Sequence, residues 1–174
     1  MKNIIRGKVW VGGDNIDAYK ILPERRWIDD SRNPEDFGLW ALEDADPNFK
    51  DVPWALKNSG ATIVVVGRNY GGGGKSIETP VYAVQGAGIK AVVADSFSRF
   101  NFRNSINNGF PVVTCSRINE KISTGDEIEI NLADGSIHII KTDEVINITP
   151  LSPFAQELLD CGGYINYVKE KLTK

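Results

Sequence analysis

The chain has few of the side chains that bind transition metals. It contains two cysteines, Cys115 and Cys161, and one histidine, His138. The cysteines lie far apart and form no CxxC pair, so four good nitrogen and sulfur ligands cannot be assembled from this inventory. We therefore expect no metal on this chain, unpaired thiols in a reducing compartment, and a structural role for His138 within its strand pattern.

Long apolar runs and an excess of positive charge are also missing. No apolar run approaches the roughly 18 residues needed to cross a bilayer, and the N-terminus has no apolar segment before a cleavage site. The formal net charge is −3, so there is no general basic field of the kind that holds nucleic-acid phosphates. We expect a soluble, cytoplasmic protein that binds neither membranes nor nucleic acids.

The apolar segments that are present indicate an α/β fold. Ala61 to Val66 is a continuous β-branched run, which is typical of a strand covered on both faces, and Lys90 to Asp95 repeats it. A helix from about Glu78 to Gln85 lies between them, so the unit predicts two parallel strands joined by a right-handed crossover. With 174 residues, 41% of them hydrophobic, the chain predicts one domain over residues 1–174.

Other segments complete the expected order of elements. We predict an opening strand that ends at Gly12, an irregular segment over about 17–38, and a C-terminal hairpin plus helix over about 126–174. Three shorter elements are also expected: a helical turn over Leu39 to Asp46, a helix over Arg99 to Asn107, and a strand at PVVTC. The hairpin turns at Ala133-Asp134-Gly135, and the last helix is interrupted at Gly162-Gly163.

A glycine cluster, GRNYGGGGKS at Gly67 to Ser76, follows the first buried run. The order strand, glycine cluster, Lys, Ser and helix is that of a nucleotide-binding P-loop. The spacing G-x-x-x-x-G-K-[ST] misses by one position, because Asn69 stands where the first glycine should be. The glycine signal alone is therefore weak evidence for a nucleotide.

Five motifs in order resemble the small subunit of 3-isopropylmalate dehydratase. They cover most of the chain and are GDNID (13–17), EDADP (43–47), GRNYGGGG (67–74), SFSRFNFRNSINNGFP (96–111) and CGGYINYVKEKL (161–172). The resemblance implies the swivel domain of the aconitase superfamily, a three-layer β/β/α fold. It also implies a hydroxy-dicarboxylic acid substrate, as in leucine biosynthesis, and a large partner subunit that carries a [4Fe–4S] cluster.

This sequence departs from the pattern of that family at the presumed site. In the family the loop continues G-S-S-R-E-H, whereas here Gly74 and Lys75 hold the two serine positions and Ser76 holds the arginine position. The resemblance implies that the first serine is the base and that the arginine grips a substrate carboxylate; glycine cannot be a base. Upstream, Ala18 and Tyr19 replace a threonine and an aspartate. The chain thus resembles a divergent member with an altered site, and isopropylmalate itself is a doubtful substrate.

Three interpretations of GGGGKS remain open. The loop amides, the dipole of the following helix and Lys75 could bind an anion. Lys75 could instead be a base with a lowered pKa, or Lys75 and Ser76 could be a solvated turn and helix cap. The candidate catalytic residues are Lys75 and Ser76. The candidate substrate-binding residues are Arg68, Asn69, Gly71, Gly72, Gly73, Gly74, Arg25 and Arg26.

Other basic residues have two readings each. Arg25, Arg26 and Arg32 lie in the irregular segment with Trp27, where they could grip a carboxylate or only solubilise a loop. Arg99 and Arg103 share one helix face and could contact the site, the sheet or a partner. We expect a hydro-lyase subunit; the alternative is a non-catalytic swivel-fold binding or regulatory protein that has lost the active-site residues. A homo-oligomer is a further expectation for the isolated chain.

Overall fold

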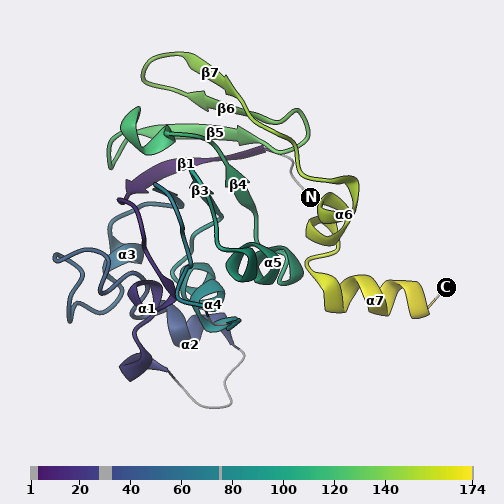
Figure 1. The fold of residues 1–174 in the computed structure, drawn as a ribbon, viewed down its shortest axis with the longest axis horizontal. Helices are drawn as coiled ribbons and strands as arrows, with labels where there is room; N and C mark the ends of the chain where they lie inside the picture. The colour runs from purple at the N-terminus through teal and green to yellow at the C-terminus, as the bar shows by residue number, and fades with distance from the viewer. Residues whose placement is uncertain (1–3, 28–32, 75, 174) are drawn as a thin grey trace.

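The computed structural model of the chain describes residues 4–27, 33–74 and 76–173. Its centre is a seven-stranded sheet with the strand order β4-β3-β2-β1-β5-β6-β7. The strands are β1 (Ile4–Val11), β2 (Ile63–Val66), β3 (Ala91–Ala94), β4 (Val112–Thr114), β5 (Glu127–Asn131), β6 (Ser136–Ile139) and β7 (Glu144–Asn147). In Figure 1 the strands β5 to β7 lie above the other four, and most helices lie below, which is the predicted β/β/α layering.

The four strands β1 to β4 form a parallel half. Val64 of β2 pairs with Trp10 of β1 on one side and with Val92 of β3 on the other, and β4 pairs parallel with β3. Every residue of β2 and β3 is at most 1% exposed. The two continuous β-branched runs are therefore strands covered on both faces, as predicted.

The other half of the sheet is antiparallel and begins on the same first strand. Residues Ile4 to Lys8 of β1 pair with β5, whereas Val9 to Val11 pair with β2. The expected hairpin of β5 and β6 is confirmed, and buried and partly buried residues alternate along both strands. Strand β7, which pairs antiparallel with β6, is not among the expected elements.

Segment 17–38, expected to be irregular, carries three short helical elements in its described part. They are α1 (Ala18–Ile21), the 3-10 helix η1 (Glu24–Arg26) and α2 (Pro34–Gly38). The Asp17 side chain caps α1, and Asn33 followed by Pro34 starts α2. These helices are too short to show a hydrophobic periodicity in the sequence, and only their capping residues indicate them. Residues 39–46 form successive turns and no helix.

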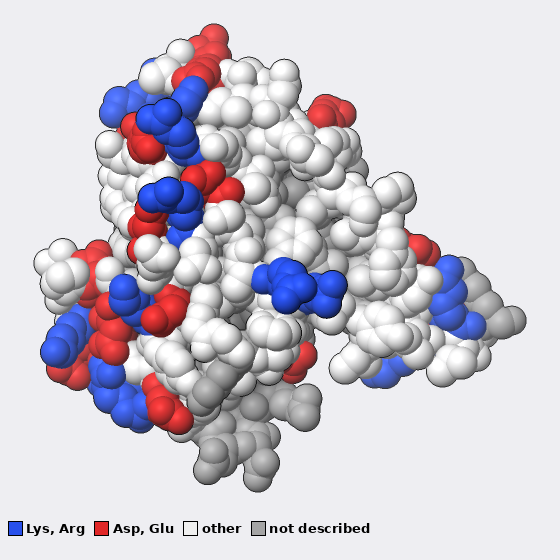
Figure 2. Space-filling view, in the orientation of Figure 1, with Lys and Arg blue, Asp and Glu red and all other residues white. Residues whose placement is uncertain are grey.

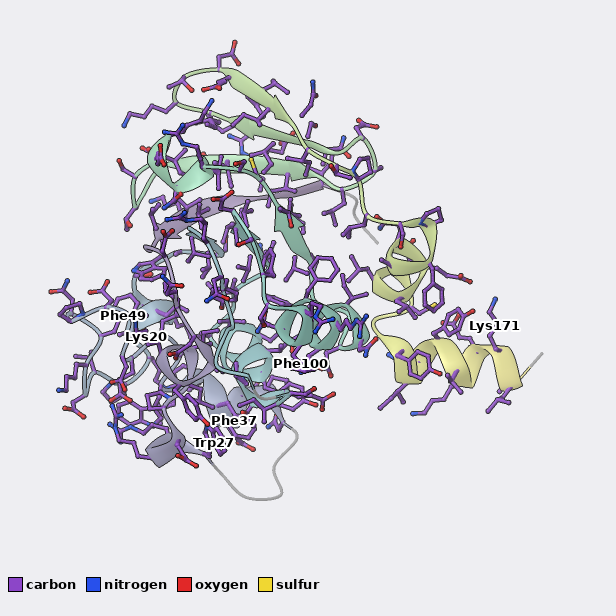
Figure 3. The ribbon with its side chains drawn as sticks, in the orientation of Figure 1. Lys20, Trp27, Phe37, Phe49, Phe100 and Lys171 are labelled. Carbon is purple, nitrogen blue, oxygen red and sulfur yellow. The ribbon has the colours of Figure 1, made fainter. Side chains whose placement is uncertain are left out.

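The remaining helices cover the sheet or extend from it. They are α3 (Ala55–Asn58), α4 (Thr79–Gly86), α5 (Arg99–Asn107), the 3-10 helix η2 (Ile118–Glu120), α6 (Pro153–Asp160) and α7 (Tyr164–Leu172). Helix α5 has the predicted bounds. Helix α7, which carries Lys171, projects away from the body of the molecule and has no buried residue (Figures 1 and 3).

Two helices on one face approach each other through glycine. A Cβ atom on Gly86 would lie 1.9 Å from the Pro34 carbonyl oxygen, and one on Gly38 would lie 2.3 Å from the carbonyl carbon of Gly86. Close contact between α2 and α4 therefore requires the absence of both side chains. Phe37, which is fully buried, fills the space beside this contact and packs on Tyr82.

One hydrophobic cluster joins the sheet to the helices below it. Within the described residues, no helix combines the length and the apolar character that a membrane span requires.

Candidate functional site

The loops after β1, β2 and β3 meet at one edge of the parallel sheet. The amide of Gly71 donates to the carbonyl of Ile16 at 2.8 Å, and the amide of Ala18 donates to the carbonyl of Gly72 at 3.0 Å. On the other side, the amide of Tyr70 donates to the carbonyl of Ser96 at 2.9 Å. The glycine loop (residues 71–77) thus lies at the carboxyl end of β2, the edge at which open α/β sheets bind ligands.

The first turn of α5 holds the beginning of the glycine loop. The Ser98 hydroxyl donates to the Gly71 carbonyl at 2.7 Å and also caps α5. Gly71 has φ +70°, and a Cβ atom there would lie 2.3 Å from the side chain of Asn101. Because Asn101 is only 5% exposed, no other residue fits at position 71 without displacing it.

The middle of the glycine loop leaves its backbone donors open. Within the described residues, the N–H groups of Gly72, Gly73, Gly74, Ser76 and Ile77 have no hydrogen-bond acceptor. These groups precede the N-terminus of α4, whose N-cap residue makes no side-chain capping bond. Unpaired N–H groups in a glycine-rich loop that leads into a helix suit an anion.

Glu78 and α5 fix the far end of the glycine loop. The Glu78 carboxylate accepts hydrogen bonds from the Tyr82 hydroxyl at 2.9 Å and from the Asn108 side chain at 3.3 Å. Asn104 donates its side-chain amide to the carbonyl of Ile77 at 2.9 Å. The sequence interpretation missed these contacts; the S-x-x-N capping signal at Ser98 and the asparagines of α5 are what could have indicated them.

Tyr19, one of the upstream departures from the family pattern, lies beside Gly73, the residue before the altered loop positions. A Cβ atom on Gly73 would lie 3.8 Å from Asp17 and 3.9 Å from the Tyr19 ring. Asp17 accepts hydrogen bonds from the amides of Tyr19 and Lys20 and so caps α1. The Tyr19 ring in turn stacks on Trp27 at 6.0 Å between centroids. Tyr19 and Trp27 therefore form one wall beside Gly73, and we call these two residues the altered wall.

Arg68 and Asn69, expected to bind substrate, bond instead to the residues that follow β1. The Arg68 guanidinium donates to one Asp14 oxygen from Nε at 3.1 Å and from Nη2 at 2.8 Å, although its side chain is 71% exposed. The Arg68 backbone amide and then its side chain lower the pKa of Asp14. Asn69, with φ +60°, donates its side-chain amide to Asn15 at 3.0 Å. Both side chains thus have partners within the chain.

Arg25 and Arg26, also expected to grip a carboxylate, are held by carboxylates of the chain itself. Arg25 forms two hydrogen bonds with Asp44, at 2.8 and 2.7 Å, and Arg26 forms two with the buried Glu43. The Arg26 guanidinium also lies 3.6 Å from the centre of the Trp40 ring. Among the described residues, this network shares no hydrogen bond or ion pair with the glycine loop.

Two expected residues lie at the limit of what the structure describes. Lys75 and Arg32 fall outside the described residues. Ser76 is exposed and lies in the loop shortly before α4.

The few metal-binding side chains are dispersed. Cys115 is buried, Cys161 donates to Glu170 at 3.5 Å, and His138 lies 2.7 Å from Asp143. Within the described residues, no group of three or more His, Cys, Asp or Glu is placed to hold a metal ion.

Comparisons with known proteins find one matching domain family and several relatives that align over nearly the whole chain. The Aconitase C-terminal domain family matches residues 32–117. The isopropylmalate/citramalate isomerase small subunit of Methanocaldococcus jannaschii is 38% identical over 100% of this chain and 99% of its own length. The 3-isopropylmalate dehydratase small subunit of Aliarcobacter butzleri is 41% identical over 99% and 98%.

Solved structures agree with these relatives. The crystal structure of 3-isopropylmalate dehydratase from Methanocaldococcus jannaschii superposes with a TM-score of 0.83 and 32% identity, covering 98% of this chain and 96% of that chain. Aconitase X from Thermococcus kodakaraensis shares the fold, with a TM-score of 0.54 and 17% identity over 79% of this chain and 90% of that chain.

Proposed function

The chain belongs to the family of 3-isopropylmalate dehydratase small subunits, which are aconitase-type hydro-lyase subunits, and we propose that its glycine loop binds one carboxylate of a hydroxy-dicarboxylic acid. The observation that carries this proposal is the set of open backbone N–H groups in Gly72, Gly73, Gly74, Ser76 and Ile77. They lie at the carboxyl end of β2 and directly before α4.

Backbone donors can replace a lost arginine in binding an anion. A helix N-terminus carries about half a positive charge, and amides that point outward donate to carboxylate oxygens without any side chain. The Glu78 carboxylate is already bound by Tyr82 and Asn108, so the loop amides remain open. The grip lacks the planar two-bond geometry of a guanidinium, so the loop alone discriminates less between carboxylates.

The altered wall is proposed to select the substrate. Gly74 has no side chain that could act as a base. The Tyr19 ring lies beside Gly73, at the position where the family pattern has an aspartate. We therefore propose a substrate other than isopropylmalate, with Lys75 adding a compact positive charge to the loop. Lys75 is the candidate base or carboxylate contact, and Ser76 is proposed to contact the same carboxylate.

The proposed partner is a large subunit that carries the iron–sulfur cluster. Such a cluster supplies Lewis-acid activation of the substrate hydroxyl when it is bound. The relatives are themselves named small subunits. This chain would bind and orient the carboxylate, and would exclude water when it closes over the partner. We propose that this occurs in the cytoplasm.

Reconstitution of the enzyme tests this function. The large subunit of the same enzyme is purified with its cluster intact, and dehydration is measured with and without this chain on a panel that includes isopropylmalate and citramalate. We expect turnover of at least one 2-hydroxy dicarboxylate only when both chains are present. A stable two-chain complex that turns over no member of a broad panel would favour the non-catalytic alternative.

A further inference from the structure

Two arginines on α5 differ from the other arginines of the chain. Arg99 and Arg103 are both exposed and lie one turn apart. Within residues 4–27, 33–74 and 76–173, neither guanidinium forms an ion pair, whereas the other five described arginines all do: Arg6, Arg25, Arg26, Arg68 and Arg117. Like charges at this spacing slightly destabilise a helix, so the isolated chain gains nothing from the arrangement.

The surrounding surface is neutral. Figure 2 shows an isolated blue patch over α5, surrounded by white atoms, while the blue atoms at the left of the same view are mixed with red ones. The chain has 23 acidic residues, yet among the described ones none forms an ion pair with this patch, so its positive charge is not compensated by direct pairing. A partner surface with the opposite charge would compensate it.

A cavity lies beside the two arginines. It has a volume of about 310 Å³ and is lined by Ser96, Phe97, Arg99, Phe102, Arg103 and Thr114. Thr114 ends β4, the edge strand of the sheet. Phe100, on the same helix, is 41% exposed (Figure 3). Arginine and aromatic side chains together are characteristic of protein interfaces.

The exposure of the arginines favours a protein partner over a small free anion. A carboxylate that meets exposed guanidinium groups in water gains little, because both charges stay hydrated. When a protein surface covers the pair, water is excluded and the hydrogen bonds become stronger. The exposed Phe100 would also be covered only by a partner of protein size.

We propose that α5 is a docking surface for an acidic segment of the large subunit, whose carboxylate enters the cavity between Arg99 and Arg103. This inference rests on the proposed function, since it assigns a partner to the same enzyme. It also connects docking with the site. Ser98, the N-cap of α5, and Asn104 of α5 donate to the carbonyls of Gly71 and Ile77, so fixing α5 fixes both ends of the glycine loop.

The test measures affinity for the purified large subunit. The variant is Arg99→Ala with Arg103→Ala, and the matched control is Lys8→Ala with Lys90→Ala, which removes the same charge from exposed positions at the amino ends of the parallel strands. We expect the Kd of the arginine variant to rise at least about tenfold at low salt, and its salt dependence to become shallower. The control should change by less than about threefold.

Each other outcome identifies a different error. Equal Kd values for wild type and arginine variant, with thermal melting unchanged, would overturn the docking surface and leave the proposed function intact. No complex between the wild-type chain and the large subunit would overturn both. If the variant instead disrupts self-association of the chain alone, measured by sedimentation, the occupant is a second copy. An unchanged Kd with a raised KM would assign the arginines to the substrate.

Discussion

The buried carboxylate of Glu43 accepts two hydrogen bonds from Arg26, from Nε at 3.0 Å and from Nη2 at 2.7 Å. The Glu43 side chain is 1% exposed and also accepts from the backbone amide of Asp51 at 3.1 Å. The pair therefore connects η1 to the loop around residues 43–51. Trp27, the residue that ends η1, belongs to the altered wall.

Removal of this guanidinium should destabilise the fold. Arg26→Ala leaves a buried charge with fewer partners, so we expect the free energy of unfolding to fall by about 3 kcal/mol. The control is Arg6→Ala, which breaks the exposed pair with Glu127 and should cost less than about 1 kcal/mol. Urea denaturation at neutral pH measures both. Equal losses would mean that the buried pair contributes no more than a surface one.

The same pair predicts an acid dependence of stability. Burial, the largest single influence, raises the pKa of Glu43, but the bonds from Arg26 and Asp51 and the charge of Arg25 together lower it below its ordinary 4.5. The unfolded chain therefore binds a proton at Glu43 more readily than the folded chain does, and the free energy of unfolding rises with pH in the acidic range. The contribution of Glu43 to stability is complete above about pH 4.5 and is lost as the pH falls through the lower pKa of the folded state.

Denaturation at several acidic pH values checks this. Between about pH 5 and pH 2, the unfolding free energy of the wild type should fall more steeply than that of Glu43→Gln, which cannot titrate at this position. Parallel curves would show that other carboxylates cause the acid loss.

The close contact of α2 and α4 predicts a strong effect at one glycine. Gly86→Ala places a Cβ atom 1.9 Å from the backbone oxygen of Pro34, which cannot move as a flexible side chain can. We expect a loss of about 2–3 kcal/mol of unfolding free energy. Gly13→Ala, where a Cβ atom meets nothing within 4 Å, is the matched control and should change stability by less than about 0.5 kcal/mol. Thermal or chemical denaturation distinguishes them.

The charge in the glycine loop predicts an effect on catalysis. If Lys75 holds a substrate carboxylate, Lys75→Ala in the reconstituted enzyme should weaken transition-state binding by about 1.5–3 kcal/mol, a roughly 10- to 150-fold fall in kcat/KM. Lys57→Ala, an exposed lysine next to Trp54, serves as control. Unchanged kinetics on the best substrate would leave the loop as a solvated turn.

Rebuilding the family's residues should require both altered positions. Gly74→Ser, Lys75→Ser and Ser76→Arg restore the loop, but the Tyr19 ring still lies 3.9 Å from the Cβ position of Gly73. We expect activity on isopropylmalate only when Ala18→Thr and Tyr19→Asp are added. Full activity of the loop variant alone would show that Tyr19 does not limit the substrate.

Sequence reasoning succeeded where the signal was local and failed where a partner was distant. The buried runs before Gly67 and Asp95 and the nine-residue α5 carry their own periodicity and caps, so the parallel core was predictable. The ion pairs of Arg25 and Arg26 were not, because Glu43 and Asp44 lie well down the chain and nothing in either segment specifies the pairing.

The candidate site was predictable in position but not in detail. Its place after β2 follows from the strand and glycine pattern, and the family motifs indicated which positions had changed. That Tyr19 faces Gly73, and that Asn101 closes on Gly71, depends on how three separate loops cross. Only the folded chain brings them together.

The division of β1 between the two halves of the sheet affects how the chain folds. Its first five residues find their partners only in Glu127–Asn131, so one edge of the strand stays unpaired on the ribosome until most of the protein has been made. Such a high contact order predicts slow folding, in the range of milliseconds to seconds, and an interval in which the nascent strand depends on chaperones to avoid pairing with other chains.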